Sequence, residues 1–167
     1  EGADALTVTR LCRELSCDRR VIYNRFRDID EINLIVADRC NEELMDKAGT
    51  VMDPHTSFDE NVIAFMKAAF TYIYEQNAFF QHYAALYKIT DKGVRNKMLQ
   101  GLTDLIEDGK SKGDVHAETD SCRAALNIWT VMTGISSMLA SNANYKYQEG
   151  LDTMLYGVEA VLLYMRR

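Results

Sequence analysis

Apolar residues recur at intervals of three and four along almost the whole chain, and this spacing is typical of amphipathic helices. No stretch alternates apolar and polar residues as a half-buried strand would. The pattern therefore predicts an all-α protein. The predicted helices cover residues 8–15, 19–25, 30–48, 58–75, 77–89, 91–110, 119–141 and 146–166.

Local signals mark the start of several of these helices. Thr7 and Asp18 are residue types that cap helix N-termini, and each precedes a short helical stretch. Ser57 and Glu60 have the spacing of a capping box, in which each side chain bonds the backbone N–H of the other residue. These residues therefore predict where three of the helices begin.

The clearest break in the chain covers residues 49–57, which include the single proline. It predicts a division into an N-terminal region, residues 1–47, and a larger helical region, residues 48–167. The two regions also differ in charge. Residues 7–27 hold six arginines against two acidic residues, a net of +4, whereas the whole chain carries −6, which leaves −10 on the remainder.

The positive stretch predicts two short helices joined by a turn at Ser16 and Cys17. This is the layout of a helix-turn-helix, whose second helix enters the DNA major groove. A local concentration of arginine on an otherwise acidic chain is the electrostatic footprint of such an element. Val21, Ile22 and Phe26 are predicted to face inward. The outward face of the second helix then carries Arg19, Arg20, Tyr23 and Asn24.

The last two predicted helices are apolar around most of their girth, so each has to be covered on two sides. One side can pack within the protomer, and a second copy of the chain can cover the other. Gly134 and Gly157, in mid-helix, would permit close helix packing. The alternative is that both helices are central in a monomeric bundle. The residues predicted to line a homodimer interface are Met138, Leu151, Leu155, Val158 and Leu162.

Composition argues against several classes of protein. No apolar run reaches the length of about 18 residues that a membrane span needs, and no signal-peptide pattern is present, so a cytoplasmic protein is expected. The four cysteines lack CxxC spacing and a histidine cluster, which predicts reduced thiols and no metal or cofactor. A redox pair of Cys12 and Cys17 is the alternative. No catalytic motif such as GxSxG or HExxH occurs, so no enzyme is expected.

Residues 2–32 resemble the DNA-binding region of the tetracycline-repressor (TetR) family of bacterial regulators. The matching positions are Gly2, Thr7, Val8, Leu11, Cys12, Leu15, Asp18, Ile22, Tyr23 and Phe26. The rest of the chain matches the family only in helix number and order. The resemblance implies an N-terminal helix-turn-helix head on a helical-bundle domain that binds a small-molecule effector and forms the homodimer.

The resemblance also implies roles for single residues in binding a palindromic operator in double-stranded DNA. The residues that would contact phosphates are Thr7, Arg10 and Tyr23. The residues that would lie toward base edges are Arg19, Arg20 and Asn24.

Four departures from the family are expected to matter. Ser16 and Arg20 stand where glycine is usual, and Ile29 stands where a lysine is usual. A serine in a left-handed turn is strained by about 1 kcal/mol. The helix that precedes Gly2 in the family is not part of this sequence. Its absence predicts a weakly stable head with three apolar side chains exposed, Val8, Leu11 and Phe26.

Aromatic residues of the larger region are candidates for an effector pocket, because pockets among helices combine such side chains with few polar groups. The predicted lining residues are Phe65, Phe79, His82, Tyr83, Asn127, Trp129 and Thr130. Simple core packing is the alternative for each. The sequence thus predicts a ligand-responsive transcriptional repressor, and the alternative is a helical small-molecule or protein-binding module that no longer binds DNA.

Overall fold

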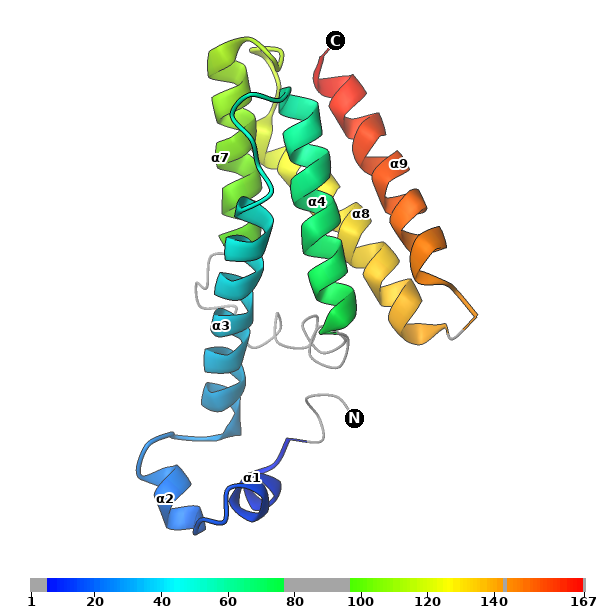
Figure 1. Ribbon diagram of the computed structural model, residues 1–167. Helices are drawn as coiled ribbons and strands as arrows, with labels where there is room; N and C mark the ends of the chain where they lie inside the picture. Colours follow the sequence, from blue (N-terminus) through cyan, green and yellow to red (C-terminus); the bar gives the residue numbers. More distant parts are fainter. Residues whose placement is uncertain (1–5, 77–96, 143, 167) are drawn as a thin grey trace. The chain divides into compact units, whose positions relative to one another are not determined.

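The structure is a computed structural model that describes residues 6–76, 97–142 and 144–166 (Figure 1). Every regular element in these ranges is a helix, as the apolar spacing predicts. The helix predicted over 77–89 lies outside the described residues, and so does the predicted start at residue 91. All other predicted ends lie within two residues of the observed ones. The helices are α1 (Val8–Glu14), α2 (Arg19–Tyr23), α3 (Ile29–Gly49), α4 (Phe58–Glu75), α7 (Lys97–Lys112), α8 (Ser121–Ser141) and α9 (Tyr147–Met165).

The chain divides into two compact units, and the division falls inside α3, between Glu42 and Glu43. The described part of the first unit consists of residues 6–42 and Gln76. The described part of the second unit consists of residues 43–75, 97–142 and 144–166. The boundary predicted after residue 47 lies five residues beyond this division and two residues before the end of α3 at Gly49.

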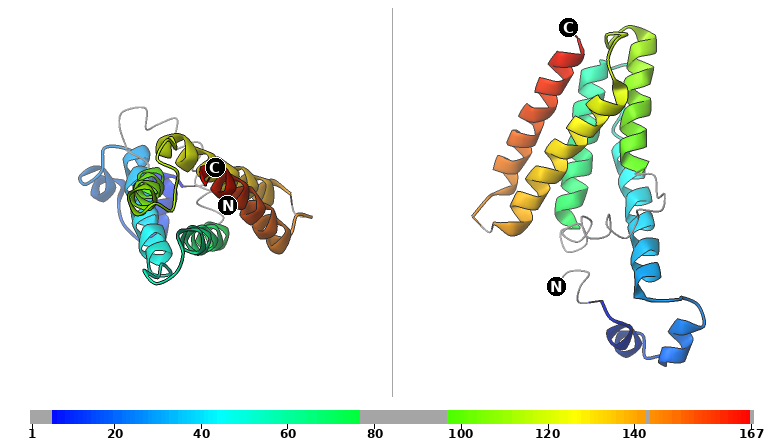
Figure 2. Two further views of the ribbon diagram at one scale, coloured as in Figure 1. Left: turned by 90° about the horizontal axis from the view of Figure 1, so that it is seen from above. Right: turned by 180° about the vertical axis from the view of Figure 1, so that it is seen from behind.

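Four helices build the core of the second unit. α8 packs against α7, α4 and α9, and α4 also packs against α9 (Figure 2). Each contributes side chains at helical spacing that are fully buried, such as Phe70 on α4, Ile106 on α7 and Ile128 on α8. Burial of one such side chain stabilises the fold by about 1.5–3 kcal/mol. The amphipathic spacing of the sequence is therefore used here to form a helical bundle.

The start of α4 confirms the capping box predicted from the sequence. The backbone N–H of Ser57 donates to Oε2 of Glu60 at 3.0 Å, and the backbone N–H of Glu60 donates to Oγ of Ser57 at 3.3 Å. Both bonds to Glu60, from the Ser57 hydroxyl and backbone, lower the pKa of its carboxyl. The N-terminus of α4 is thus determined by two residues three positions apart.

α8 and α9 approach each other closely at Gly157. A Cβ atom built on Gly157 would lie 2.7 Å from Cγ1 of Val131, which leaves no room for a side chain. The prediction that Gly157 permits close helix packing is confirmed. Gly134 differs, because nothing in the described protomer lies within 4 Å of a Cβ atom built there. Gly134 is exposed on α8 and has no packing role within the second unit.

Tyr147 holds the first turn of α9 against α4. Its ring centre lies 4.6 Å from that of Tyr74 and 5.9 Å from that of Phe70. Its hydroxyl oxygen lies 2.8 Å from Oγ1 of Thr71. Tyr147 therefore combines aromatic packing with a directional hydrogen bond, which sets the position of α9 along α4.

The fold also decides which face of α9 is internal. Leu151, Val158 and Leu162 are buried in the core of the second unit, whereas Leu155 is half-buried and Met138 on α8 is exposed. Three of the five residues predicted for a dimer interface thus belong to the core of the protomer. The large apolar side chains left on the outside of α8 and α9 are Leu126, Met138, Tyr156, Leu163 and Tyr164.

Candidate nucleic-acid interface

The first unit begins with α1, whose N-terminus is capped by Thr7. The Oγ1 atom of Thr7 accepts a bond from the backbone N–H of Arg10 at 3.2 Å. This confirms the predicted cap. α1 packs against α2, and Ile22 of α2 is buried in the first unit. Thr7 itself is exposed, and Arg10 is half-buried.

The turn between α1 and α2 is a Schellman motif. The backbone N–H of Cys17 donates to the carbonyl of Cys12 at 3.0 Å, and that of Ser16 donates to the carbonyl of Arg13 at 3.4 Å. Ser16 has a φ of 50°, and it is the one non-glycine residue with positive φ in the described part of the chain. The strained serine expected at this position is therefore present in the structure.

Replacing Ser16 with glycine is predicted to stabilise the first unit by about 1 kcal/mol, because glycine adopts the left-handed conformation without a clash of Cβ. Residue-resolved amide hydrogen exchange would measure this as a roughly fivefold slowing over residues 8–24. Unchanged or faster exchange in Ser16→Gly would contradict the strain.

The end of α7 provides the matched control for this substitution. It has the same motif with glycine at the corresponding position: Gly113 has a φ of 84°, and its N–H donates to the carbonyl of Lys110 at 3.1 Å. The N–H of Asp114 donates to the carbonyl of Gly109 at 2.9 Å. Gly113→Ser introduces the strain that Ser16→Gly removes, so it is predicted to accelerate exchange near the end of α7.

α2 begins after Asp18, which has the extended backbone of an N-cap but makes no side-chain bond to the helix. Ile22 is its buried residue, whereas Val21 is 43% exposed and Phe26 is half-buried. The prediction that Val21 faces inward is wrong. A helix of five residues packed on one neighbour buries one side, and that side is filled by Ile22.

The four residues predicted to face outward on α2 are all exposed, and Tyr23 is 56% exposed. Arg19 and Tyr23 are four residues apart, as are Arg20 and Asn24. Residues at this spacing are neighbours on a helix surface. The structure therefore leaves the two arginines, the tyrosine and the asparagine exposed on α2, with Arg20 and Asn24 on the side opposite Ile22 and with Arg19 and Tyr23 beside them.

Arg19 makes a contact that the sequence did not indicate. Its Nη2 atom donates to Oγ1 of Thr9 on α1 at 2.7 Å. The two residues are ten positions apart, so no helical spacing relates them. Arg19 thus ties α2 to α1 and positions the exposed surface as well as forming part of it.

Arg27 belongs to the cap of α3. Its guanidinium bonds Oδ2 of Asp28 at 2.8 Å, which raises the pKa of Arg27. The backbone N–H of Glu31 donates to Oδ1 of Asp28 at 2.9 Å, and this bond, followed by the bond from Arg27, lowers the pKa of Asp28. The guanidinium of Arg27 is therefore already paired with a carboxylate of the first unit.

The remaining arginines differ in their partners. Arg13 pairs with Glu14 at 3.1 Å on the surface. Within the described ranges, the exposed side chains of Arg20 and Arg25 have no hydrogen-bond or ion-pair partner. Both can therefore bind an external anion such as a phosphate. Arg25 is absent from the predicted site residues, although the net charge of the stretch includes it.

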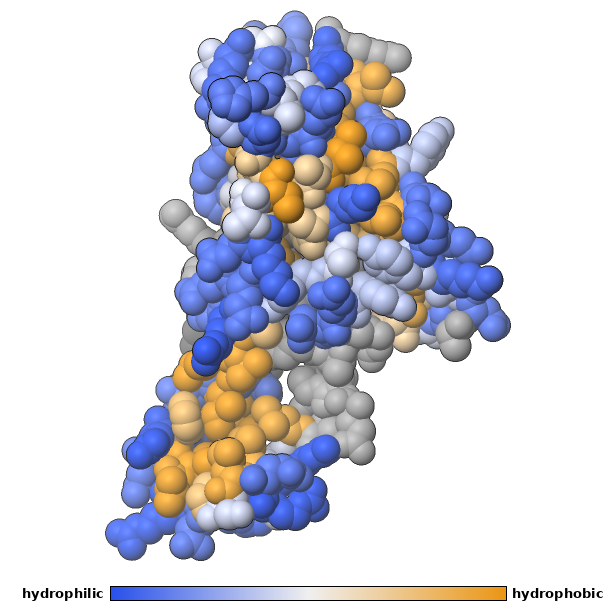
Figure 3. Space-filling view, in the orientation of Figure 1, coloured by the Kyte–Doolittle hydropathy of each residue, from blue (hydrophilic) through white to orange (hydrophobic). Residues whose placement is uncertain are grey.

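Apolar side chains remain on the surface of the first unit (Figure 3). Ile22 is the one apolar side chain that is fully buried among its described residues. The exposed large apolar side chains of the first unit are Leu15, Val21, Tyr23, Ile35 and Val36. The residues predicted to be exposed, Val8, Leu11 and Phe26, are half-buried instead. An exposed apolar surface is therefore present, but different residues form it.

The predicted pocket residues fall in different environments. Phe65 on α4 and Trp129 on α8 are buried, whereas Asn127 and Thr130 are exposed. The hydroxyl of Thr130 donates to the carbonyl of Leu126 in its own helix at 2.7 Å. The structure thus does not bring Asn127 and Thr130 together with Trp129. Three further predicted residues, Phe79, His82 and Tyr83, lie outside the described residues.

A polar group that the sequence did not indicate lies within the second unit. The buried Tyr72 on α4 donates its hydroxyl to Oε2 of Glu43 on α3 at 3.0 Å. Nζ of Lys47 lies 4.8 Å from the centre of the Tyr72 ring, in the range of a cation–π contact. Glu43 and Lys47 are four positions apart on α3, but Tyr72 is too far from both in sequence for any periodic pattern to relate it to them.

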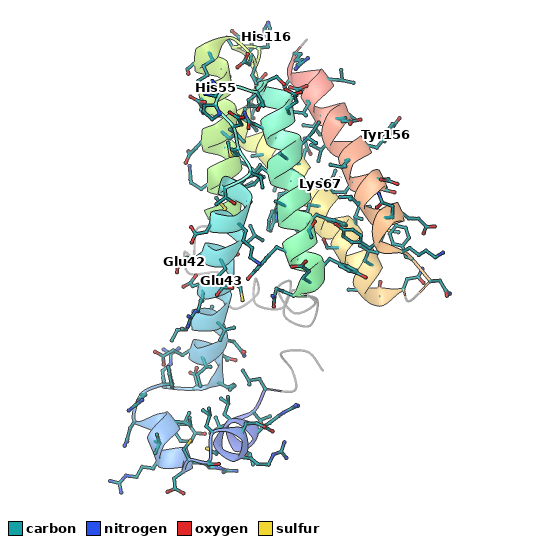
Figure 4. All side chains as sticks on the ribbon, in the orientation of Figure 1. Glu42, Glu43, His55, Lys67, His116 and Tyr156 are labelled. Atoms are coloured by element: carbon teal, nitrogen blue, oxygen red, sulfur yellow. The ribbon has the colours of Figure 1, made fainter. Side chains whose placement is uncertain are left out.

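The described residues contain no group of three histidine, cysteine, aspartate or glutamate side chains that could hold a metal ion. His55 and His116 lie in loops, after α3 and after α7 (Figure 4). Over the same ranges, no helix combines the length and the apolar character that crossing a bilayer requires.

Two solved structures are similar to the chain over nearly its whole length. One is described as the fatty acid degradation regulator FadR from Bacillus halodurans, with a TM-score of 0.72 and 14% identity, over 99% of this chain and 88% of that chain. The other is described as a bacterial regulatory protein in the tetR family from Rhodococcus RHA1, with a TM-score of 0.65 and 16% identity, over 98% and 87%. No protein-family model matches the sequence, and no curated protein sequence does.

Proposed function

We propose that this chain, which has the fold of the TetR-family regulators, is a ligand-responsive transcriptional repressor. In this proposal it binds a palindromic operator as a homodimer, and a small-molecule effector releases it. Both similar structures are regulators by their descriptions. At 14% and 16% identity they establish the fold, so the function has to be argued from this chain's own residues.

The observation that supports DNA binding most directly is the exposed surface of α2. It carries Arg20 and Asn24 on the side opposite Ile22, with the exposed Tyr23 beside them. Arginine forms paired hydrogen bonds to guanine edges, asparagine forms them to adenine, and tyrosine donates to phosphate. A short helix that presents these three residue types has the chemistry to contact both the backbone and the bases of a duplex.

Dimerisation is supported by the outer faces of α8 and α9. Their exposed apolar residues include Met138 on one helix and Tyr156 and Leu163 on the other. Figure 4 shows Tyr156 projecting outward from α9. Two symmetric copies would present two copies of α2, and a two-fold dimer of this kind matches half-sites about 34–36 Å apart.

The effector proposed for the second unit is largely apolar. Apart from Ser121 at the first position of α8, the buried residues of α4 and α8, such as Phe65 and Trp129, are apolar or aromatic. The hydroxyl of Tyr72 already bonds Glu43. An effector acts if it binds one arrangement of the dimer more tightly than the DNA-competent one, because only differential affinity shifts a population.

The experiment that tests the function is selection from a library of random duplexes. The chain is incubated with the library at low salt, retained duplexes are amplified, and several rounds are sequenced. We expect an inverted repeat to be enriched. Its affinity is expected to fall with salt, with a log–log slope of roughly 0.9 per phosphate contacted. Apolar compounds that change the fluorescence of Trp129, the single tryptophan, are expected to release the enriched duplex.

Two outcomes would overturn parts of the proposal. If no sequence is enriched over a library carried through without protein, the chain is better described as a helical binding module that does not bind DNA. If a duplex is enriched but contains one half-site without its repeat, DNA binding stands and the dimer on the operator is wrong.

A further inference from the structure

Cys12 and Cys17 occupy special positions of the turn between α1 and α2. In a Schellman motif, the second residue after the helix C-cap donates its backbone N–H to the carbonyl of the residue five positions earlier. The side chains of these two residues lie next to each other. In this chain those residues are Cys17 and Cys12, joined by the 3.0 Å backbone bond. Positions that usually hold an apolar pair here hold two thiols.

The side chains show the same proximity. Both residues are half-buried, so small reagents can reach them. Burial is the largest cause of a raised pKa at Cys12, followed by the charge and then the hydrogen-bonding effect of the neighbouring Cys17 thiol, while nearby Arg19 opposes the shift. The remaining thiols, Cys40 and Cys122, lie in other helices, α3 and α8.

We propose that Cys12 and Cys17 form a redox-active dithiol, which small disulfides convert into an intramolecular disulfide across the helix-turn-helix turn. One cysteine thiolate attacks a sulfur of the small disulfide and expels one thiolate, which leaves a mixed disulfide on the protein. The second cysteine, after losing its proton, attacks the protein-side sulfur and expels the other thiolate. Two protein thiols are oxidised, and one small disulfide is reduced to two thiols.

The geometry of the turn favours a disulfide between Cys12 and Cys17 over one that includes Cys40 or Cys122. A disulfide requires Cα atoms about 4.4–6.8 Å apart. The backbone hydrogen bond from Cys17 to Cys12 already holds the two residues close to each other. The disulfide closes a short loop around Ser16, the residue with the strained φ of 50°. Oxidation is therefore expected to hold the turn in its present conformation and to slow local unfolding of α1 and α2.

The test uses the full chain in buffers with different ratios of reduced to oxidised glutathione, followed by alkylation and trypsin. Trypsin cuts after Arg10, Arg13 and Arg19, so the two cysteines fall in different peptides, residues 11–13 and residues 14–19. We expect these peptides to be recovered as a linked pair, two hydrogen atoms lighter than their reduced sum. The pair is expected to be about tenfold more abundant than any pair that contains Cys40 or Cys122, because proximity raises the effective concentration.

Controls separate the proposed bond from general thiol oxidation. Cys12→Ser and Cys17→Ser should each abolish the linked pair, whereas the double variant Cys40→Ser/Cys122→Ser should retain it. Amide exchange over residues 8–24 should be about tenfold slower in the oxidised chain, and this difference should vanish in Cys12→Ser. The proposal would be overturned if both cysteines carried glutathione and no linked pair was found. It would also be overturned if both cysteines were alkylated at every ratio of reduced to oxidised glutathione. None of these readouts depends on DNA binding.

Discussion

Replacing Arg20 and Tyr23 together with alanine is expected to weaken binding of the selected operator by about 30- to 1,000-fold. An arginine bonded to a base edge contributes about 1–3 kcal/mol of discrimination, and a tyrosine hydrogen bond to phosphate adds about 1 kcal/mol. Neither side chain is needed for the fold, because both are exposed and Ile22 fills the buried side of α2. The double variant should therefore retain the helix content of the parent.

Titration of labelled operator at fixed salt measures this effect, and circular dichroism checks the fold. The matched control is Arg123→Ala, which removes the same charge from an exposed arginine of α8. Arg123 lies 3.6 Å from Asp120 in a surface ion pair, and such pairs contribute little to stability. The assignment of α2 as the DNA-contacting helix fails if the double variant and Arg123→Ala bind the operator equally well.

Arg19→Ala is a useful comparison, because it would report on a different role. The loss of the 2.7 Å bond to Thr9 should loosen α1 from α2, so exchange over residues 8–24 should accelerate along with any loss of affinity. Arg20→Ala should leave that exchange unchanged.

Replacing Tyr156 with glutamate is expected to convert the proposed homodimer into a monomer at micromolar concentration. Tyr156 is 77% exposed in the protomer, so in a monomer the substitution is nearly neutral. In a two-fold dimer the new charge would be buried twice at the interface, at a cost of about 3 kcal/mol or more. Sedimentation should change from a species of twice 19.0 kDa to one of 19.0 kDa.

Two further variants make this result specific. Gln148→Glu adds the same charge to an exposed position in the first turn of α9, eight residues before Tyr156, and should remain dimeric. Val158→Glu places a charge in the core, where Val158 is fully buried, and should lower the melting temperature before it changes the assembly. A Tyr156→Glu variant that sediments as the parent does would rule out this face as the interface.

The sequence by itself determined where most helices begin and end, because those signals are local. Thr7 caps α1 through a residue three positions away, and Ser57 and Glu60 cap α4 in the same way. The left-handed turn at Ser16 is expected from the resemblance to the TetR family, in which glycine is usual at this position. The exposure of Arg19, Arg20, Tyr23 and Asn24 on α2 follows from helical spacing over a short range.

Only the tertiary structure decided which face of a mostly apolar helix is internal. Periodicity could not separate Val158, which is buried, from Tyr156, which is exposed, because α9 is apolar on more than one side. Asn127 and Thr130 flank Trp129 in sequence, but residues one or two positions apart do not share a helix face. Contacts such as Arg19 to Thr9 and Tyr72 to Glu43 join residues with no periodic relation, so packing alone places them together.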